Sequence, residues 1–150
     1  MAKPPGNRIV TPSIDRLLNI LLVEDDEVDV MNVRRAFQKN RITNPLFVAT
    51  NGVDALEQLR GGAIPRDRRI ILLDLNMPRM NGIEFLKEIR QDPELNLTPV
   101  IVLTTSNDER DRIEAYNLNV AGYLLKPVTF SNFCEVMAAL NKYWALVELP

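Results

Sequence analysis

Residues 18–26, LNILLVEDD, decide the fold, because a short apolar run is closed abruptly by Glu24, Asp25 and Asp26. A run of this length with an acidic stop is typical of a strand buried in a parallel sheet, where both faces are covered. The sequence therefore predicts a buried first strand here. Similar apolar runs recur at 46–49, 70–75, 100–103 and 123–125.

Segments with the apolar periodicity of a helix lie between these predicted strands. Apolar residues fall on one face of the stretches 27–40, 53–60 and 83–90. Alternating strands and helices imply a parallel sheet covered on both sides, and right-handed crossovers leave few topologies for it. We predict an α/β fold with a doubly wound five-stranded parallel sheet of flavodoxin-like order 2-1-3-4-5, with helices on both faces.

Proline and glycine mark the start of the chain and one long connection. Pro4, Pro5 and Pro12 lie in a segment with few large apolar groups, so we predict an N-terminal arm at 1–16. Residues 17–150 then form one domain with a long final helix and a tail, as suits a chain of 150 residues. The connection at 61–69 is longer than this fold requires.

Composition narrows the class of function. Hydrophobic residues at 46% and charged residues at 25% are ordinary for a water-soluble globular protein. No apolar run approaches the roughly 18 residues of a membrane span, so we expect no membrane partner. A net charge of −2 argues against a nucleic-acid partner, because phosphate binding favours a basic excess.

Histidine and cysteine are scarce in this chain. The absence of histidine excludes a Ser-His-Asp triad, a histidine-ligated metal and a histidine phosphodonor. The one cysteine, Cys134, has no second cysteine for an intramolecular disulfide, which favours a reducing compartment and disfavours zinc. We therefore expect a cytoplasmic protein.

Polar residues follow four of the predicted strands. The acids at 24–26 follow the first strand, Asp74 falls at the end of the third, Thr104 follows the fourth and Lys126 the fifth. The carboxyl ends of parallel strands meet at one edge of a sheet, where folds of this class bind ligands. We therefore expect these side chains to share one rim.

A metal ion is the expected partner of the acids at this rim, because packed carboxylates repel one another unless a cation joins them. Mg²⁺ or Mn²⁺ suits the set, since both prefer hard oxygen ligands and need only one or two carboxylates beside a phosphate. We predict that Asp25, helped by Glu24, holds the metal. Asp26 would begin the following helix, where a carboxylate suits the helix dipole.

Asp74 is the candidate nucleophile, because it lies at the end of the central strand between the other groups. A carboxylate can attack phosphorus to give an aspartyl phosphate when the developing charge is neutralised. Lys126 would supply a positive charge to the phosphoryl oxygens, and Thr104 would supply a hydroxyl donor.

Four segments carry a family resemblance, namely VEDD at 23–26, LLDLNMPRMNG at 72–82, VLT at 102–104 and GYLLKP at 122–127. They resemble the acid pocket, phosphorylation loop, switch threonine and lysine-proline turn of response-regulator receiver domains. The resemblance extends over residues 18–145, and four motifs in this order make it specific.

The resemblance implies a signalling domain that catalyses only its own phosphorylation and dephosphorylation. A sensor histidine kinase would transfer a phosphoryl group to Asp74. Mg²⁺ would be bound by Asp25, Asp74 and the backbone carbonyl of Asn76, with Glu24 standing where many members have aspartate.

The resemblance also implies a conformational switch. Thr104 would move toward the phosphate while the aromatic ring of Tyr123 rotates inward, and Lys126–Pro127 would form a cis peptide bond, a type otherwise rare. Thr105 stands where alanine or glycine is usual, and its size bears on access to the phosphorylated site.

A subfamily resemblance indicates the kinase. The loop at 61–69, the segment DLNMPR at 74–79 and the Tyr143–Trp144 ending look like the small regulators that serve cyanobacterial and bacterial phytochromes. The kinase would then be a phytochrome. The residues after Pro127 suffice for one helix and a tail, so we expect the signal to pass by contact to a downstream protein.

The final helix has two interpretations. It either covers the sheet or presents an interface for a second copy or another protein, since aromatic residues and methionine are favoured in interface cores. We predict that Phe133, Tyr143 and Trp144 contribute to such an interface. The residues at helical spacing are Phe133, Val136, Met137, Leu140, Tyr143, Trp144 and Val147.

Other functions and simpler structural roles remain open from the residues alone. A magnesium-dependent phosphatase of the haloacid-dehalogenase type also uses a strand-end aspartate, but it needs an acid two residues later, where Asn76 cannot donate a proton. The net charge of −2 argues against a transcription factor. Taken one at a time, these residues also have simple structural interpretations. The acids at 24–26 are typical of a solvated helix start, Asp74 could be an ordinary turn residue, and Lys126 could be a surface lysine.

Overall fold

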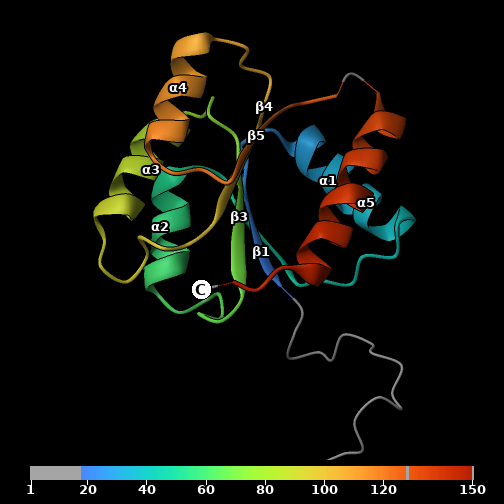
Figure 1. Ribbon diagram of the computed structural model, residues 1–150, viewed down its shortest axis with the longest axis horizontal. Coiled ribbons are helices and arrows are strands. Elements are labelled where there is room, and N and C mark those ends of the chain that lie inside the picture. The colour runs from blue at the N-terminus through green and yellow to red at the C-terminus, as the bar shows by residue number, and fades with distance from the viewer. Residues whose placement is uncertain (1–17, 128, 150) are drawn as a thin grey trace, which may run out of the picture.

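Five parallel strands form one sheet in the order β2-β1-β3-β4-β5, which confirms the predicted α/β topology (Figure 1). The structure is a computed structural model that describes residues 18–127 and 129–149, so the predicted arm at 1–16 lies outside the described residues. The strands are β1 Asn19–Val23, β2 Leu46–Ala49, β3 Arg69–Leu73, β4 Val100–Thr104 and β5 Gly122–Leu125.

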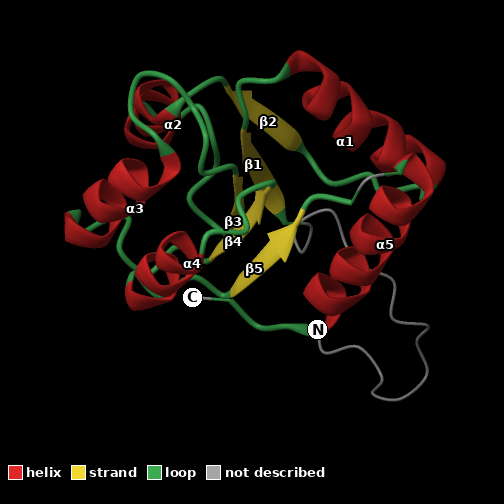
Figure 2. Ribbon diagram, turned by 90° about the horizontal axis from the view of Figure 1, so that it is seen from above, coloured by secondary structure: helices red, strands yellow, loops and turns green. Residues whose placement is uncertain are grey.

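Helices cover both faces of this sheet. Figure 2 shows α1 and α5 on one side, with α2, α3 and α4 on the other. Each strand is followed by one helix, which is the doubly wound arrangement that right-handed crossovers produce. The helices are α1 Glu27–Lys39, α2 Gly52–Arg60, α3 Gly82–Gln91, α4 Glu109–Asn117 and α5 Phe130–Leu146.

The core of the described chain divides into two clusters, one on each face of the sheet. Ile20 and Leu22 belong to the cluster under α1 and α5, whereas Leu21 and Val23 belong to the cluster under α2 and α3. Successive side chains of a strand point to opposite faces. The run LNILLV is apolar nearly throughout because β1 has no face toward water.

Two elements differ from the sequence prediction. α4 was not predicted, because only Ala115 is buried among its nine residues and the helix shows little apolar periodicity. β3 ends at Leu73, two residues earlier than the predicted run of 70–75. Asp74 is therefore the first residue beyond the strand and begins the connection to α3.

α5 supports the simpler interpretation of the final helix for two of its three aromatic residues. Phe133 and Trp144 are buried in the cluster that α5 shares with α1, with exposed fractions of 7% and 3%. Tyr143 is 59% exposed. The predicted interface is therefore corrected: burial against the sheet removes Phe133 and Trp144 from the surface, and Tyr143 alone of the three faces solvent.

Candidate functional site

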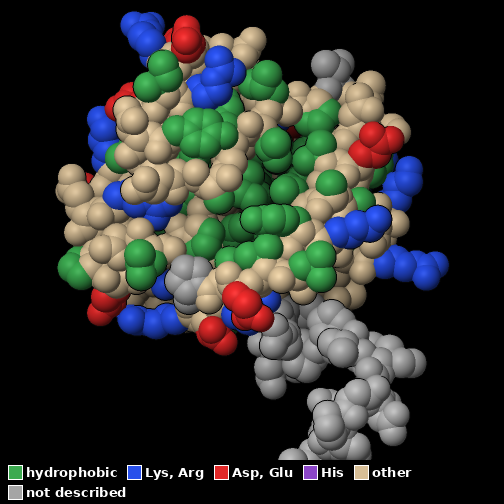
Figure 3. All heavy atoms as spheres, viewed as in Figure 1, with side chains coloured by type: hydrophobic (Ala, Val, Ile, Leu, Met, Phe, Trp, Pro, Cys, Tyr) green, Lys and Arg blue, Asp and Glu red, His purple; other side chains and the backbone are tan. Residues whose placement is uncertain are grey.

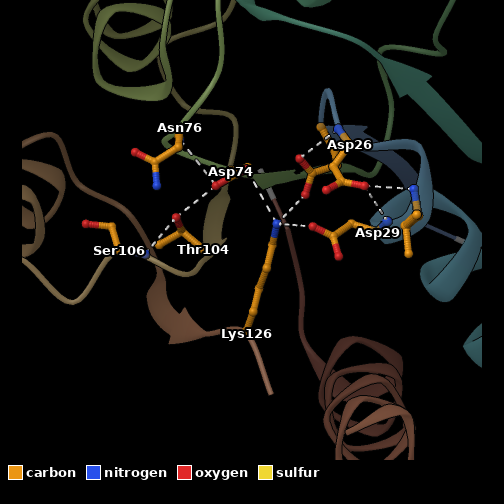
Figure 4. Close-up of polar contacts among 9 residues, drawn as sticks. Asp26, Asp29, Asp74, Asn76, Thr104, Ser106 and Lys126 are labelled. Atoms are coloured by element: carbon orange, nitrogen blue, oxygen red, sulfur yellow. Dashed lines mark hydrogen bonds and ion pairs between the residues drawn. The ribbon is translucent and has the colours of Figure 1, made fainter. Parts of the chain in front are cut away.

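The carboxyl edge of the sheet brings the predicted site residues together (Figure 4). Three of them are the first residue after a strand and continue its backbone hydrogen bonding. The Glu24 amide donates to the carbonyl of Ala49, the Asp74 amide to that of Val23, and the Lys126 amide to that of Thr104. The sheet itself thus fixes the spacing of these side chains.

Asp74 lies at the centre of this edge and is buried. Its Oδ1 accepts a hydrogen bond of 2.8 Å from the Thr104 hydroxyl and one of 3.3 Å from the Asn76 amide. Its Oδ2 lies 3.4 Å from Nζ of Lys126. A hydroxyl, an amide and an ammonium therefore surround one carboxylate, and the sequence predicts the hydroxyl and the ammonium but not the Asn76 amide.

Two further carboxylates converge beside Asp74. Glu24, Asp25 and Asp74 each offer an oxygen, and these oxygens all lie within 4.8 Å of one another. Glu24 is buried and Asp25 is exposed. Burial raises the pKa of Glu24 to about 8, against the lowering effect of its hydrogen bond with Lys126. Oxygen ligands without nitrogen or sulfur fit Mg²⁺ or Mn²⁺.

Asp26 has the role predicted for it. It is the N-cap of α1, and its side chain accepts hydrogen bonds from the amides of Val28 and Asp29. This use of its carboxylate directs Asp26 away from the convergent group of acids.

Lys126 contacts three carboxylates. Its Nζ bonds to Glu24, lies 2.6 Å from Oδ2 of Asp29 and lies 3.4 Å from Oδ2 of Asp74. Burial alone would lower the pKa of Lys126, but the hydrogen bonds that it donates to Asp29 and Glu24 outweigh this effect, and the pKa lies above its ordinary value. The lysine is therefore held charged within the acidic group.

Asp29 is a site residue that the sequence reasoning missed. It lies in the first turn of α1, three residues after the N-cap Asp26, and acids are favoured in the first turn of a helix. That position was the available signal.

The β4–α4 connection joins the two predicted switch residues. The Ser106 amide donates to Oγ1 of Thr104 at 3.2 Å, and the Tyr123 hydroxyl donates to the Ser106 carbonyl at 2.9 Å. The Ser106 hydroxyl donates to Asp111 of α4 at 2.6 Å. Ser106 thus links Thr104, Tyr123 and α4, a role that the sequence did not reveal.

The Lys126–Pro127 bond is trans, as are all peptide bonds among the described residues. The cis bond that the resemblance implied is therefore corrected. The trans isomer is intrinsically the favoured form of a bond that precedes proline.

Gly82 fixes the β3–α3 connection against the site. A Cβ at Gly82 would lie 2.6 Å from the carbonyl oxygen of Asp74 and 2.7 Å from Cα of Leu75. The Gly82 amide also donates to the Leu75 carbonyl at 3.0 Å. The absence of a side chain lets the start of α3 approach the backbone of Asp74.

We predict that Gly82→Ala lowers the free energy of unfolding by about 1–3 kcal/mol, because backbone atoms must shift to admit the methyl group. Gly122→Ala is the matched control, since the nearest atom to its added Cβ would be 3.9 Å away. Urea denaturation of both variants measures the effect. Equal stability losses would contradict the steric explanation.

This chain belongs to the response regulator receiver domain family, whose sequence profile matches residues 20–138. Response regulator Rcp1 of Synechocystis is 37% identical over 135 residues, which cover 87% of this chain and 92% of Rcp1. The probable methanogenesis regulatory protein FilR2 of Methanothrix harundinacea is 36% identical over 130 residues, covering 83% of this chain and 82% of FilR2.

Solved structures support the same assignment. The crystal structure of the phosphorylated cyanobacterial phytochrome response regulator RcpA superposes with a TM-score of 0.79 at 33% identity, covering 89% of this chain and 99% of RcpA. The Mn²⁺-bound form of Rcp1 superposes with a TM-score of 0.77 at 36% identity, with the same coverage of each chain. The acidic group and this relative together support divalent metal binding.

Membership of this family makes the chain a response regulator with a signalling domain rather than an ordinary enzyme, and gives no support to a haloacid-dehalogenase phosphatase. Within the part of the chain that is described, no helix has the length and apolar character needed to cross a bilayer.

Proposed function

We propose that the protein accepts a phosphoryl group from a sensor histidine kinase on Asp74 and signals through contacts with other proteins. The observation that carries the proposal is the surroundings of Asp74. Its buried carboxylate lies between the Thr104 hydroxyl at 2.8 Å and the Lys126 ammonium at 3.4 Å, beside the carboxylates of Glu24 and Asp25. Residues 17–150 form the receiver unit in this proposal.

The transfer forms one bond and breaks another. An oxygen of the Asp74 carboxylate bonds to phosphorus while the phosphorus–nitrogen bond of the kinase phosphohistidine breaks. The electron pair of that bond leaves with the imidazole nitrogen, which takes a proton from solvent. The donor histidine must belong to the kinase, because this chain has none.

A divalent ion completes the proposed site. Asp25, Asp74 and the backbone carbonyl of Asn76 would hold Mg²⁺, or Mn²⁺, with Glu24 beside them. When bound, the ion supplies positive charge to the transferring phosphoryl oxygens. The convergence of three carboxylates within 4.8 Å supports this ligand set.

Thr104 and Lys126 are the proposed sensors of phosphorylation. Both already contact the carboxylate of Asp74, so a phosphoryl group placed on Asp74 offers both of them new acceptor oxygens. Contacts made in one state only shift a two-state equilibrium toward that state. Movement of Thr104 would reach Tyr123 through Ser106, which contacts both residues.

A phytochrome is the proposed kinase. RcpA is a cyanobacterial phytochrome response regulator, and its structure superposes on 89% of this chain. The proposal places both proteins in the cytoplasm. Phosphotransfer profiling tests it: a phytochrome kinase should phosphorylate the protein faster than unrelated sensor kinases, and equal rates would contradict this choice.

The proposed output surface lies over α4, β5 and α5. Figure 3 shows hydrophobic side chains gathered across this face of the molecule. Exposed apolar residues of this kind mark contact sites, which suits a downstream protein or a second copy in a homodimer. The large hydrophobic residues exposed on these elements are Ile113, Tyr116, Leu125, Tyr143 and Leu146.

The proposed chemistry predicts metal-dependent labelling. Incubation with acetyl phosphate and Mg²⁺ should add one phosphoryl group, and chelation of the metal should prevent it, because the charge on the phosphoryl group is then not neutralised. Mass spectrometry of the intact protein measures the gain. Labelling at the same rate in chelator would contradict the metal site, and steady turnover of small phosphate esters would indicate a phosphatase instead.

A further inference from the structure

Lys126 has one carboxylate neighbour that the proposed reaction does not use. Its Nζ lies 2.6 Å from Oδ2 of Asp29, compared with 3.4 Å from Oδ2 of Asp74. Figure 4 shows the Asp29 side chain on the α1 side of the ammonium. Asp29 is therefore a closer partner of the lysine than the phosphoacceptor candidate itself.

All three hydrogen-bond donors of the Lys126 ammonium have an acceptor in this arrangement. A lysine ammonium has three donors, and the carboxylates of Glu24, Asp29 and Asp74 accept one each. The Lys126 side chain is only 11% exposed, so these carboxylates replace water as its partners.

The Asp29 side chain does not cap α1 in the described structure. An acid at the third position of a helix commonly closes a capping box with the N-cap amide. Here the amide of the N-cap, Asp26, donates instead to Oε2 of Glu24 at 3.3 Å. The Asp29 carboxylate is left to face Lys126.

Asp29 also lies outside the set of carboxylates suited to a metal. Among the described residues that set comprises Glu24, Asp25 and Asp74. Two of its members, Glu24 and Asp74, are also partners of the Lys126 ammonium. A divalent cation and an ammonium repel each other over such short distances, so they compete for the same oxygens.

We infer that Asp29 is a positioning residue that holds the Lys126 ammonium on the α1 side of the site. This contact gives the ammonium a carboxylate partner outside the metal set, so a divalent cation can displace it from Glu24 and Asp74 while the lysine stays near Asp74. The inference deepens the proposed function and rests on it for the identity of the metal ligands.

The first test reads the position of Lys126 in the metal-free, unphosphorylated protein. We expect Asp29→Asn to shift the side-chain NMR resonances of Lys126, which are assigned by their loss in Lys126→Ala. Asp29→Glu should restore most of the shift. Glu27→Gln, which removes an exposed charge from the same helical turn, should leave it unchanged. Unchanged Lys126 resonances in Asp29→Asn, or an equal shift in Glu27→Gln, would overturn the inference.

The second test measures Mn²⁺ affinity in a double-mutant cycle. With Lys126 present, Asp29→Asn should weaken binding about tenfold, the scale of one charge-assisted hydrogen bond. In the Lys126→Ala background the same substitution should cost about threefold or less, as expected for loss of a partly exposed charge. Equal losses in the two backgrounds would show that Asp29 acts only through its charge and would overturn the inference.

These tests separate the inference from the proposed function. Neither uses phosphorylation, so a failure of Asp74 to accept phosphate leaves both readouts intact. A protein that binds no Mn²⁺ would refute the proposed metal site, whereas the Lys126 resonances would still decide whether Asp29 positions the lysine.

Discussion

Asp74→Asn should abolish phosphorylation by acetyl phosphate and Mg²⁺. An amide has no anionic oxygen to attack phosphorus, although its shape allows it to keep the hydrogen bond from Thr104. Loss of a nucleophile costs on the order of 10⁴-fold or more in rate, which places the variant below detection by intact-protein mass spectrometry.

Asp26→Asn is the matched control for this experiment. It removes the same charge from the same edge of the sheet, and asparagine caps a helix about as well as aspartate. Because the Asp26 side chain accepts from the first amides of α1, we expect this variant to be phosphorylated normally. Unchanged labelling of Asp74→Asn would refute the choice of nucleophile.

Lys126→Ala should accept a phosphoryl group and yet fail to switch. Thr104 and Lys126 both contact the Asp74 carboxylate, and we expect the switch to need both contacts, so that Thr104 alone does not shift the equilibrium. Hydrogen exchange of the β4–α4 connection measures the response. Phosphorylation should change the exchange in the wild type and leave it unchanged in the variant.

The same variant should lose stability in the absence of metal. Removal of one partner from a buried ionic group costs about 3 kcal/mol, and the remaining carboxylates repel one another. Mg²⁺ should restore part of the loss, because it binds the folded state. Lys142→Ala, at an exposed position of α5, is the control.

For the hydrogen-exchange experiment, a Lys126→Ala protein whose β4–α4 connection still responds to phosphorylation would contradict the coupling role of Lys126.

The central strands of the sheet could be predicted because they are buried on both faces. All five residues of β3 and of β4 are buried, which leaves continuous apolar runs in the sequence. α4 escaped prediction for the opposite reason, since it buries only Ala115. The apolar periodicity of a helix is strong only when the helix buries a wide apolar face.

The site residues that follow strands were predictable from topology alone. Glu24, Asp74 and Lys126 each lie at the end of a predicted strand or directly after it, and parallel strands bring their ends together. Asp29 and Ser106 were not predictable in this way, because their roles depend on side-chain and backbone directions within a helix turn and a loop. Trp144 could not be assigned from its residue type alone, because aromatic residues are common both in cores and in interfaces.

The most direct measurement is the identity of the residue that carries the phosphoryl group. Borohydride reduces an acyl phosphate to an alcohol, so reduction of the phosphorylated protein followed by peptide mapping marks the modified position. We predict the mark on Asp74 alone. A mark on Glu24, Asp25 or Asp29, or a phosphoryl group that resists reduction because it is on Thr104, would contradict the proposed site.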